Sequence, residues 1–114
     1  MPRVHHVSSE GPPLSSGADA LGLIYEDPAQ EAEWIAVPAS RFDPAFFALD
    51  SGLAGEFVQK FANYRLRLAV VGDISAHVDA SAALRDFVRE SDRGGHVIFV
   101  ADAEELDRRL AEER

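Results

Sequence analysis

The chain has 114 residues, of which 46% are hydrophobic and none is cysteine. This length suits one domain around one core, and the lack of cysteine excludes disulfides and thiolate sites. A net charge of −9, from 20 acidic and 11 basic residues, disfavours nucleic acid and anionic membranes as partners. No apolar run approaches the roughly 20 residues that cross a bilayer, and the start has no apolar core typical of a secretory signal. We therefore expect a single cytoplasmic domain over residues 1–114.

The first segments predict a weak strand followed by a helix. Arg3 to Ser8 has few apolar residues and is typical of an edge strand, and Gly11-Pro12-Pro13 then breaks the chain, so that residues 1–14 form a strand and a proline-containing turn. Ser16 with Asp19 three residues later predicts a helix start. We expect Asp27-Pro28 to close this helix or to start a turn.

The middle of the chain predicts a strand, a short helix and one long amphipathic helix. Trp34 to Val37 is a short apolar run that Pro38 ends. Asp43-Pro44 is a favourable helix start, and the short helix that follows stops near Gly52. From Gly52 to Tyr64 the apolar residues recur every four positions, which predicts a two-sided helix packed on a sheet.

The last third predicts two buried strands and two further helices. Leu66 to Val71 and Val97 to Val100 are nearly continuous apolar runs, which suit parallel strands covered on both faces. Between them we expect a helix over about Ala80 to Ser91, stopped at Gly94-Gly95. Asp102 with Glu105 resembles a capping box at the start of the last helix.

This alternation of strands and helices predicts the α/β class. We expect about four mainly parallel strands with flanking helices, joined by right-handed crossovers, in two or three layers.

Two stretches resemble a known family. They are FFALDSGLAGEFVQKFANYRLRLAVVGD, from Phe46 to Asp73, and LRDFVRESDRGGHVIFVAD, from Leu84 to Asp102. Together they resemble the bacterial DUF-4180 family, a domain of unknown function. That family has no established activity, so the resemblance implies no function.

A more distant resemblance is to the sulfate-transporter and anti-sigma-factor-antagonist (STAS) fold. Its strand leads into an Asp-Ser-Ser-Gly-Leu-like turn and a helix, and Asp50-Ser51-Gly52-Leu53 occupies that turn here. In the antagonist proteins a partner kinase phosphorylates the serine before the glycine, so the resemblance implies modification of Ser51. One serine of the turn is missing, and the short helix after Asp43 separates the turn from the preceding strand.

Several residues around this turn are candidates for binding. Free N–H groups at a helix start favour an anion, and Gly52 and Gly55 would let a ligand approach Ser51 closely. Alternatively, Ser51 or Asp50 only caps the helix, and the glycines allow tight packing on the sheet.

A second group of candidates follows the polar stripe of the long helix and the end of the next strand. Glu56, Lys60 and Asn63 share one face, where Glu56 could act as an acid or base and Lys60 could hold an anion beside Asp73. Asp73 follows a parallel strand, which is where α/β sheets place ligands. The alternatives are a solvated helix face and an aspartate that caps a turn.

The sequence predicts no metal site, no cofactor and no catalytic group. His5 and His6 are adjacent and point to opposite faces of a strand, while we expect His77 in a loop and His96 at the start of a strand. No nucleophile–base pair, P-loop or dinucleotide motif is present.

We therefore favour a non-enzymatic regulatory or protein-interaction module that binds a protein partner around Ser51, Glu56, Lys60 and the helix with Arg85 and Glu90. The alternative is a small-molecule or anion-binding protein, or a small enzyme, whose pocket lies at the strand ends near Gly52, Glu56, Lys60 and Asp73. A third hypothesis is a homo-oligomer. It rests on more aromatic residues than we expect one short segment to bury, namely Trp34, Phe42, Phe46 and Phe47.

Overall fold

Four parallel strands form the centre of the fold, in the order β1-β2-β3-β4. The computed structural model describes residues 2–26 and 31–112. The strands are β1 (Val4–His6), β2 (Trp34–Pro38), β3 (Arg67–Val71) and β4 (Val97–Val100). The α-helices are α1 (Gly17–Ile24), α2 (Leu53–Asn63), α3 (Ser75–Ala80), α4 (Ala82–Gly94) and α5 (Ala103–Glu112), and three short 3-10 helices are η1 (Ala39–Arg41), η2 (Pro44–Phe47) and η3 (Leu49–Ser51). The predicted α/β fold with a parallel sheet is confirmed, and β1 is an edge strand as expected.

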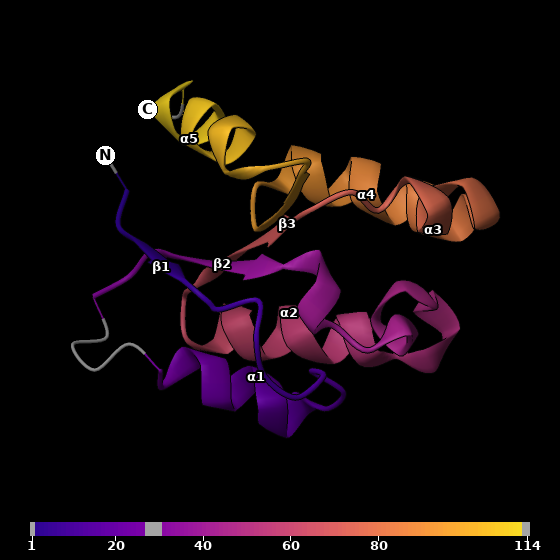
Figure 1. Cartoon of the computed structure of the whole chain (residues 1–114), viewed down its shortest axis with the longest axis horizontal. Coiled ribbons are helices and arrows are strands. Elements are labelled where there is room, and N and C mark those ends of the chain that lie inside the picture. Colours follow the sequence, from indigo (N-terminus) through magenta and orange to yellow (C-terminus); the bar gives the residue numbers. More distant parts are fainter. Residues whose placement is uncertain (1, 27–30, 113–114) are drawn as a thin grey trace.

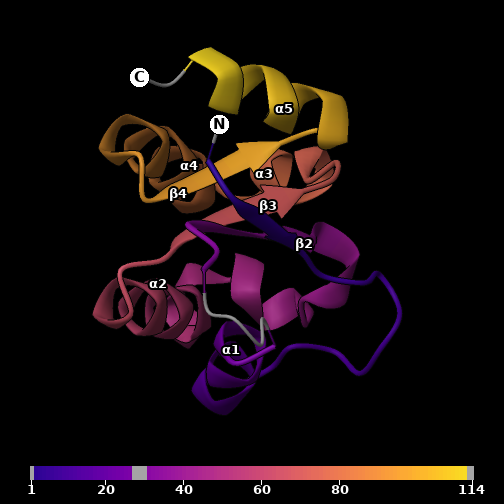
Figure 2. The same ribbon diagram turned by 90° about the vertical axis from the view of Figure 1, so that its left-hand side faces the viewer.

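Both faces of the sheet are covered, which gives three layers. Alternate residues of β2 point to opposite faces. Ile35 and Val37 lie in the larger apolar cluster with buried residues of α1, α2 and α4. Trp34 and Ala36 lie in the smaller cluster with Leu106 of α5. Figures 1 and 2 show α1 and α2 side by side on one side of the sheet and α5 on the other. This explains the continuous apolar runs of β2 and β3, because their side chains are buried in both directions.

Several helices begin or end at capping residues that could be predicted from the sequence. The Ser16 hydroxyl accepts a hydrogen bond from the N–H of Asp19, and the Asp102 carboxylate accepts one from the N–H of Glu105. Gly95 ends α4 with a φ of 75°, in the left-handed region. These predicted caps are confirmed. Asp27-Pro28, expected to close the first helix, lies outside the described residues, and α1 ends at Ile24.

The helix predicted over Ala80 to Ser91 is α4, and a further helix that was not predicted lies before it. A short helix, α3, precedes α4, and His77 lies in α3 rather than in the predicted loop. The boundary is set by Ser81, whose extended backbone ends α3 and whose hydroxyl accepts a hydrogen bond from the N–H of Leu84 to start α4. The six residues of α3 bury no side chain fully, so they have no apolar periodicity from which a helix could be predicted.

The aromatic residues expected to be too numerous for one short segment to bury are all buried. Phe42, Phe46 and Phe57 pack together, with ring centroids 4.1 Å apart for Phe42–Phe46 and 5.5 Å apart for Phe46–Phe57. Trp34 and Phe47 are buried as well. The 3-10 helices after β2 bury the phenylalanines, because they fold residues 39–51 against α2, whereas Trp34 is buried against α5 on the other face of the sheet. Excess aromatic surface is therefore no argument for an oligomer.

Candidate functional site

The carboxyl ends of β2 and β3 lie at the same edge of the sheet, because the two strands are parallel. The chain leaves β2 at Pro38 into η1, and it leaves β3 at Val71 through Gly72 and Asp73. Open α/β sheets bind ligands outside the carboxyl ends of their strands, usually where the strand order reverses, and the order β1-β2-β3-β4 has no such reversal. Here η2 and α3 pack beside these loops and add side chains from both segments to the edge.

Two hollows open at this edge and share a wall. The first, of about 250 Å³, is lined by Ser40, Phe47, Gly72, Asp73 and His77 among others. The second, of about 530 Å³, is lined by residues of η2, η3, α3 and α4, and again by Phe47 and His77. We call these two hollows together the strand-edge site.

The shared wall is a stacked pair of rings. The centroids of Phe47 and His77 are 4.3 Å apart, and the ring planes differ by 13°. Phe47 is buried, whereas His77 is exposed. The pair depends on η2, which starts where the Asp43 carboxylate accepts a hydrogen bond from the N–H of Ala45. Neither ring was a predicted site residue.

Asp73 supplies negative charge to the strand-edge site. Its carboxylate accepts a hydrogen bond of 2.9 Å from the N–H of Ser75. Hydrogen bonds from the Ser75 side chain and then its backbone lower the pKa of Asp73 below its ordinary value, so the group is ionised at neutral pH. Gly72 precedes it with a φ of 143°, and a Cβ there would lie 3.0 Å from that of Ala39. The glycine is therefore required for the close approach of the two strand ends.

Ser51 and Gly52 form the junction between η3 and α2. The Ser51 hydroxyl donates a hydrogen bond of 2.6 Å to the carbonyl of Ala45 and accepts one of 3.2 Å from the N–H of Leu53. Gly52 takes a φ of 82° as the residue before α2. The Ser51 hydroxyl therefore accepts the hydrogen bond of the first N–H of α2, while Gly52 occupies the N-cap position without a side-chain cap, and Ser51 stays exposed. A Cβ at Gly55 would meet no other atom within 4 Å, so packing does not require this glycine.

Glu56 and Lys60 line a different hollow, with α1, and not the hollow that Asp73 lines. That third hollow, of about 460 Å³, is completed by Gly17, Ala18, Leu21 and Gln59. The structure thus separates the candidates that the sequence grouped into one pocket. Asn63 is exposed at the end of α2.

Arg85 and Glu90 are exposed on α4. The Arg85 guanidinium donates a hydrogen bond of 3.3 Å to the carbonyl of Val78 in α3. It therefore ties the two helices together and does not reach into the strand-edge site.

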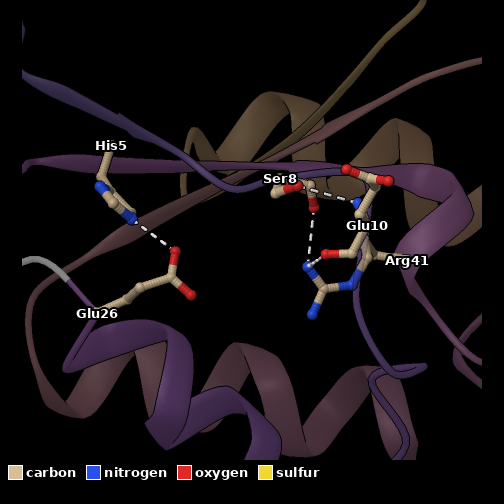
Figure 3. A network of polar contacts seen from close by, with 5 residues as sticks. All are labelled: His5, Ser8, Glu10, Glu26 and Arg41. Atoms are coloured by element: carbon tan, nitrogen blue, oxygen red, sulfur yellow. Dashed lines mark hydrogen bonds and ion pairs between the residues drawn. The ribbon is translucent and has the colours of Figure 1, made fainter.

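Arg41 is a buried cation that sequence reasoning missed. Its guanidinium donates to the carbonyls of Ser8 at 2.8 Å, Glu10 at 3.2 Å and Pro12 at 3.3 Å, and the residue is only 9% exposed. Figure 3 shows the guanidinium below the segment that follows β1. A Cβ at Gly11 would lie 2.9 Å from the Arg41 Cζ, so the backbone closes tightly around the cation. Arg41 therefore holds the connection between β1 and α1, and its role is structural.

A separate contact in the same view joins His5 and Glu26, with 2.8 Å between the His5 Nε2 and the Glu26 carboxylate (Figure 3). Among residues 2–26 and 31–112, no group of three or more histidine, aspartate or glutamate side chains is arranged to hold a metal ion. No helix in this part of the chain is long and apolar enough to cross a membrane.

The comparisons with known proteins bear on the family alone. No curated protein and no solved structure matches the chain, so the resemblance to the STAS fold stays a prediction. The structure places η1, η2 and η3 between β2 and the Asp50-Ser51-Gly52-Leu53 turn, which agrees with the departure from that fold noted in the sequence. The model of the family described as domain of unknown function DUF4180 matches residues 2–110, and the chain belongs to this family.

Proposed function

We propose that this domain is a binding module whose strand-edge site takes a small molecule bearing a positive charge. The observation that carries the proposal is the pair of hollows that meet at the Phe47–His77 stack, at the carboxyl ends of two parallel strands. Ligand sites in general combine apolar walls with a few polar groups, as these two hollows do.

The charge of the lining selects the ligand class. Asp73 lies in one hollow and Asp50 in the other, and the described residues that line them include no lysine or arginine. Carboxylates attract cations. Ser40 adds a hydroxyl that can accept a hydrogen bond from an ammonium group. An anion, the ligand class weighed from the sequence, would meet repulsion at this edge.

A thermal-shift comparison tests the proposal. Small ammonium compounds, such as a diamine and choline, are compared with dicarboxylates of similar size. A bound ligand at 100 times its dissociation constant stabilises by about 2.7 kcal/mol, which gives a visible shift. We expect a shift with the cations alone, and loss of that shift in Asp73→Asn and His77→Ala. Equal shifts with both charge classes, or no loss in these two variants, would contradict the proposal.

A second candidate function is a regulatory, protein-interaction module of the cytoplasm controlled at Ser51. It is favoured by the exposed Ser51 hydroxyl, which lies at the start of the eleven-residue helix α2 and holds that junction. A phosphoryl group on the Ser51 Oγ would remove its hydrogen bond to Ala45 and place negative charge near the helix start, where the helix dipole favours it. The exposed charged residues of α4, Arg85 and Glu90 among them, would extend the partner surface.

Intact-mass analysis of the chain purified from its own cells tests this second candidate. We expect an added phosphoryl mass that maps to Ser51 and disappears in Ser51→Ala. The matched control is Ser75→Ala, another exposed serine. A bare mass under all growth conditions, together with wild-type behaviour of Ser51→Ala and Ser51→Glu, would overturn it.

A further inference from the structure

The two tyrosines of the chain meet at the ends of α1 and α2. Tyr25 and Tyr64 are 39 positions apart, and the sequence has no other tyrosine. Their rings meet edge to face with centroids 5.7 Å apart, and their hydroxyl oxygens are 2.6 Å apart. The hydroxyl-bearing ends of the two rings are therefore in contact, and the ring carbons beside each hydroxyl lie at this contact.

Backbone hydrogen bonds hold both tyrosines in this position. Each directly follows its helix, at the C-cap position, and the N–H of Tyr25 donates to the last turn of α1 at 3.0 Å. After Tyr64, the backbone of Arg65 takes a φ of 58°, in the left-handed region. The N–H of Leu66 then donates to the carbonyl of Phe61 at 2.9 Å, which is a common way for a helix to end. The ring contact therefore rests on a backbone that is fixed on both sides.

The tyrosine pair is open to an oxidant in solution. Tyr25 is 54% exposed and Tyr64 is 42% exposed. Trp34, the single tryptophan of the chain, also gives up one electron readily, but it is fully buried. The chain has no cysteine, so it has no thiol of its own that would reduce a tyrosyl radical. One-electron oxidation is therefore directed to the two tyrosines.

We propose that Tyr25 and Tyr64 form an oxidative modification site, at which a haem peroxidase with hydrogen peroxide couples the two rings into an intramolecular dityrosine. Each phenol gives one electron to the oxidised haem and its hydroxyl proton to water. The two radicals then form a carbon–carbon bond between the ring positions next to the hydroxyls. The protons on these two carbons leave, and the two oxygens take up protons again. Overall, two tyrosines and one hydrogen peroxide give one dityrosine and two water molecules.

The contact favours coupling within one chain over coupling between chains. Two groups that are held together react as if at a concentration far above that of any protein solution. The net charge of −9 also opposes the approach of two chains. The hydrogen bond with Tyr64 raises the pKa of Tyr25, so this hydroxyl is protonated at neutral pH, with the Tyr64 oxygen 2.6 Å away.

The cross-link joins the carboxyl ends of α1 and α2. These helices pack side by side on one face of the sheet (Figures 1 and 2). The new bond closes a loop between residues 39 positions apart, and a covalent link of this span stabilises a protein by constraining its unfolded chain. By this argument, we expect the cross-linked chain to unfold at a temperature about 8–16 °C higher. The inference does not depend on a ligand at the strand-edge site.

Treatment of the purified chain with a haem peroxidase and hydrogen peroxide tests the proposal. We expect the monomer to lose the mass of two hydrogen atoms and to gain the blue fluorescence of dityrosine. Cleavage after lysine and arginine places Tyr25 in residues 4–41 and Tyr64 in residues 61–65, so these two peptides should be recovered joined. Tyr25→Phe and Tyr64→Phe should each abolish the monomeric product. Trp34→Phe, which removes the other oxidisable ring, is the matched control and should keep it. Circular dichroism of each variant checks that it folds.

The unfolded chain is a control that needs no substitution. A photo-activated ruthenium complex with persulfate, a one-electron oxidant that acts in urea, allows the folded and the unfolded chain to be compared. The yield of cross-linked monomer should fall at least tenfold in urea, because the two tyrosines are no longer in contact. In the folded chain the yield should not change with protein concentration.

Three results would overturn the proposal. The first is equal coupling in the folded and the unfolded chain, which would mean that the contact has no effect. The second is a product in which two chains are joined, or no coupled product with either oxidant. The third is a cross-linked chain that unfolds at the temperature of the unmodified one, since the bond would then not tie α1 to α2.

Discussion

Replacing Arg41 with methionine would test whether this buried cation holds the chain between β1 and α1. Methionine keeps most of the aliphatic length of the side chain but has no donor group. The carbonyls of Ser8, Glu10 and Pro12 would then lose the three hydrogen bonds that the guanidinium donates, at 2.8, 3.2 and 3.3 Å. The substitution thus removes hydrogen bonds with little change in packing.

The expected loss follows from these three bonds. A hydrogen bond to a charged group contributes about 1.5–3 kcal/mol when water cannot replace it. The three carbonyls belong to exposed residues, which water can reach once the segment loosens, so we take about 1 kcal/mol for each bond. The sum is about 3 kcal/mol in the free energy of unfolding. For a chain of this size, it lowers the midpoint of thermal unfolding by about 12 °C.

Urea denaturation of Arg41→Met and of a matched control measures this loss. The control is Arg3→Met, because Arg3 makes an exposed ion pair with Glu31 at 3.1 Å, and such pairs contribute less than about 1 kcal/mol. Arg41→Lys should lie between the two, since one ammonium cannot span three carbonyls. If Arg41→Met and Arg3→Met lose the same stability within about 0.5 kcal/mol, the argument for Arg41 is refuted.

Other substitutions have expected outcomes of different sign. Phe57→Ala should lose about 3–5 kcal/mol in urea denaturation, because its fully buried ring packs against three other phenylalanines. Gly95→Ala should lose about 1–2 kcal/mol because of its φ of 75°, while Gly55→Ala, inside a helix with open space at its Cβ, should gain about 0.5–1 kcal/mol. The pKa of Asp73 is lowered, so its ionised carboxylate stabilises the fold fully at a pH above the ordinary carboxyl pKa. This stabilisation is lost as the pH falls through the lowered pKa. In Asp73→Asn the free energy of unfolding should therefore fall less steeply at acid pH. The pKa of Tyr25 is raised, chiefly through its hydrogen bond with Tyr64. Its protonated hydroxyl therefore stabilises the fold fully below about pH 10, and this stabilisation is lost as the pH rises through the raised pKa. In Tyr25→Phe the free energy of unfolding should no longer fall in this alkaline range.

Each of these outcomes has a clear contrary result. A loss below about 1 kcal/mol in Phe57→Ala would mean that the cluster repacks without it. Equal effects of alanine at Gly95 and Gly55 would contradict the backbone argument. Unchanged acid or alkaline limbs in the Asp73 and Tyr25 variants would show that these side chains do not set the pH dependence of stability.

The fold could be predicted from the sequence because its strands are uninterrupted apolar runs. Leu68 to Val70 is buried on both faces, and such a run is typical of a parallel strand covered by helices on both sides. The ends of the helices could be predicted from capping residues, such as Ser16 before α1 and Gly95 after α4. The helix α3 escaped prediction because it lies on the surface without an apolar stripe, and because Ile74, the residue before it, has no capping side chain.

The strand-edge site could be predicted only in part. Asp73 could be predicted as a candidate because it directly follows a parallel strand, so it lies at the carboxyl edge of the sheet however the other segments fold. The Phe47–His77 wall was missed because it joins residues 30 positions apart through η2 and α3. The role of Arg41 could not be predicted for a related reason. Its hydrogen-bond acceptors are backbone carbonyls, which every residue has, so no particular residue type in the sequence marks them. Glu56 and Lys60 were expected to face the strand end, but α1 lies beside their stripe.

The order of the strands determines how the sheet grows as the chain leaves the ribosome. Each strand pairs only with its neighbours in sequence, so a new strand adds to a free edge and never has to enter between two paired ones. Each addition joins residues about 30 positions apart, as in Val4 with Trp34 and Leu68 with Val97, and closes a loop of that length. At about 5–20 residues per second, each unit has about 2–6 seconds before the next emerges. The sheet can therefore form stepwise during translation, with β4 and its covering helix α5 added last.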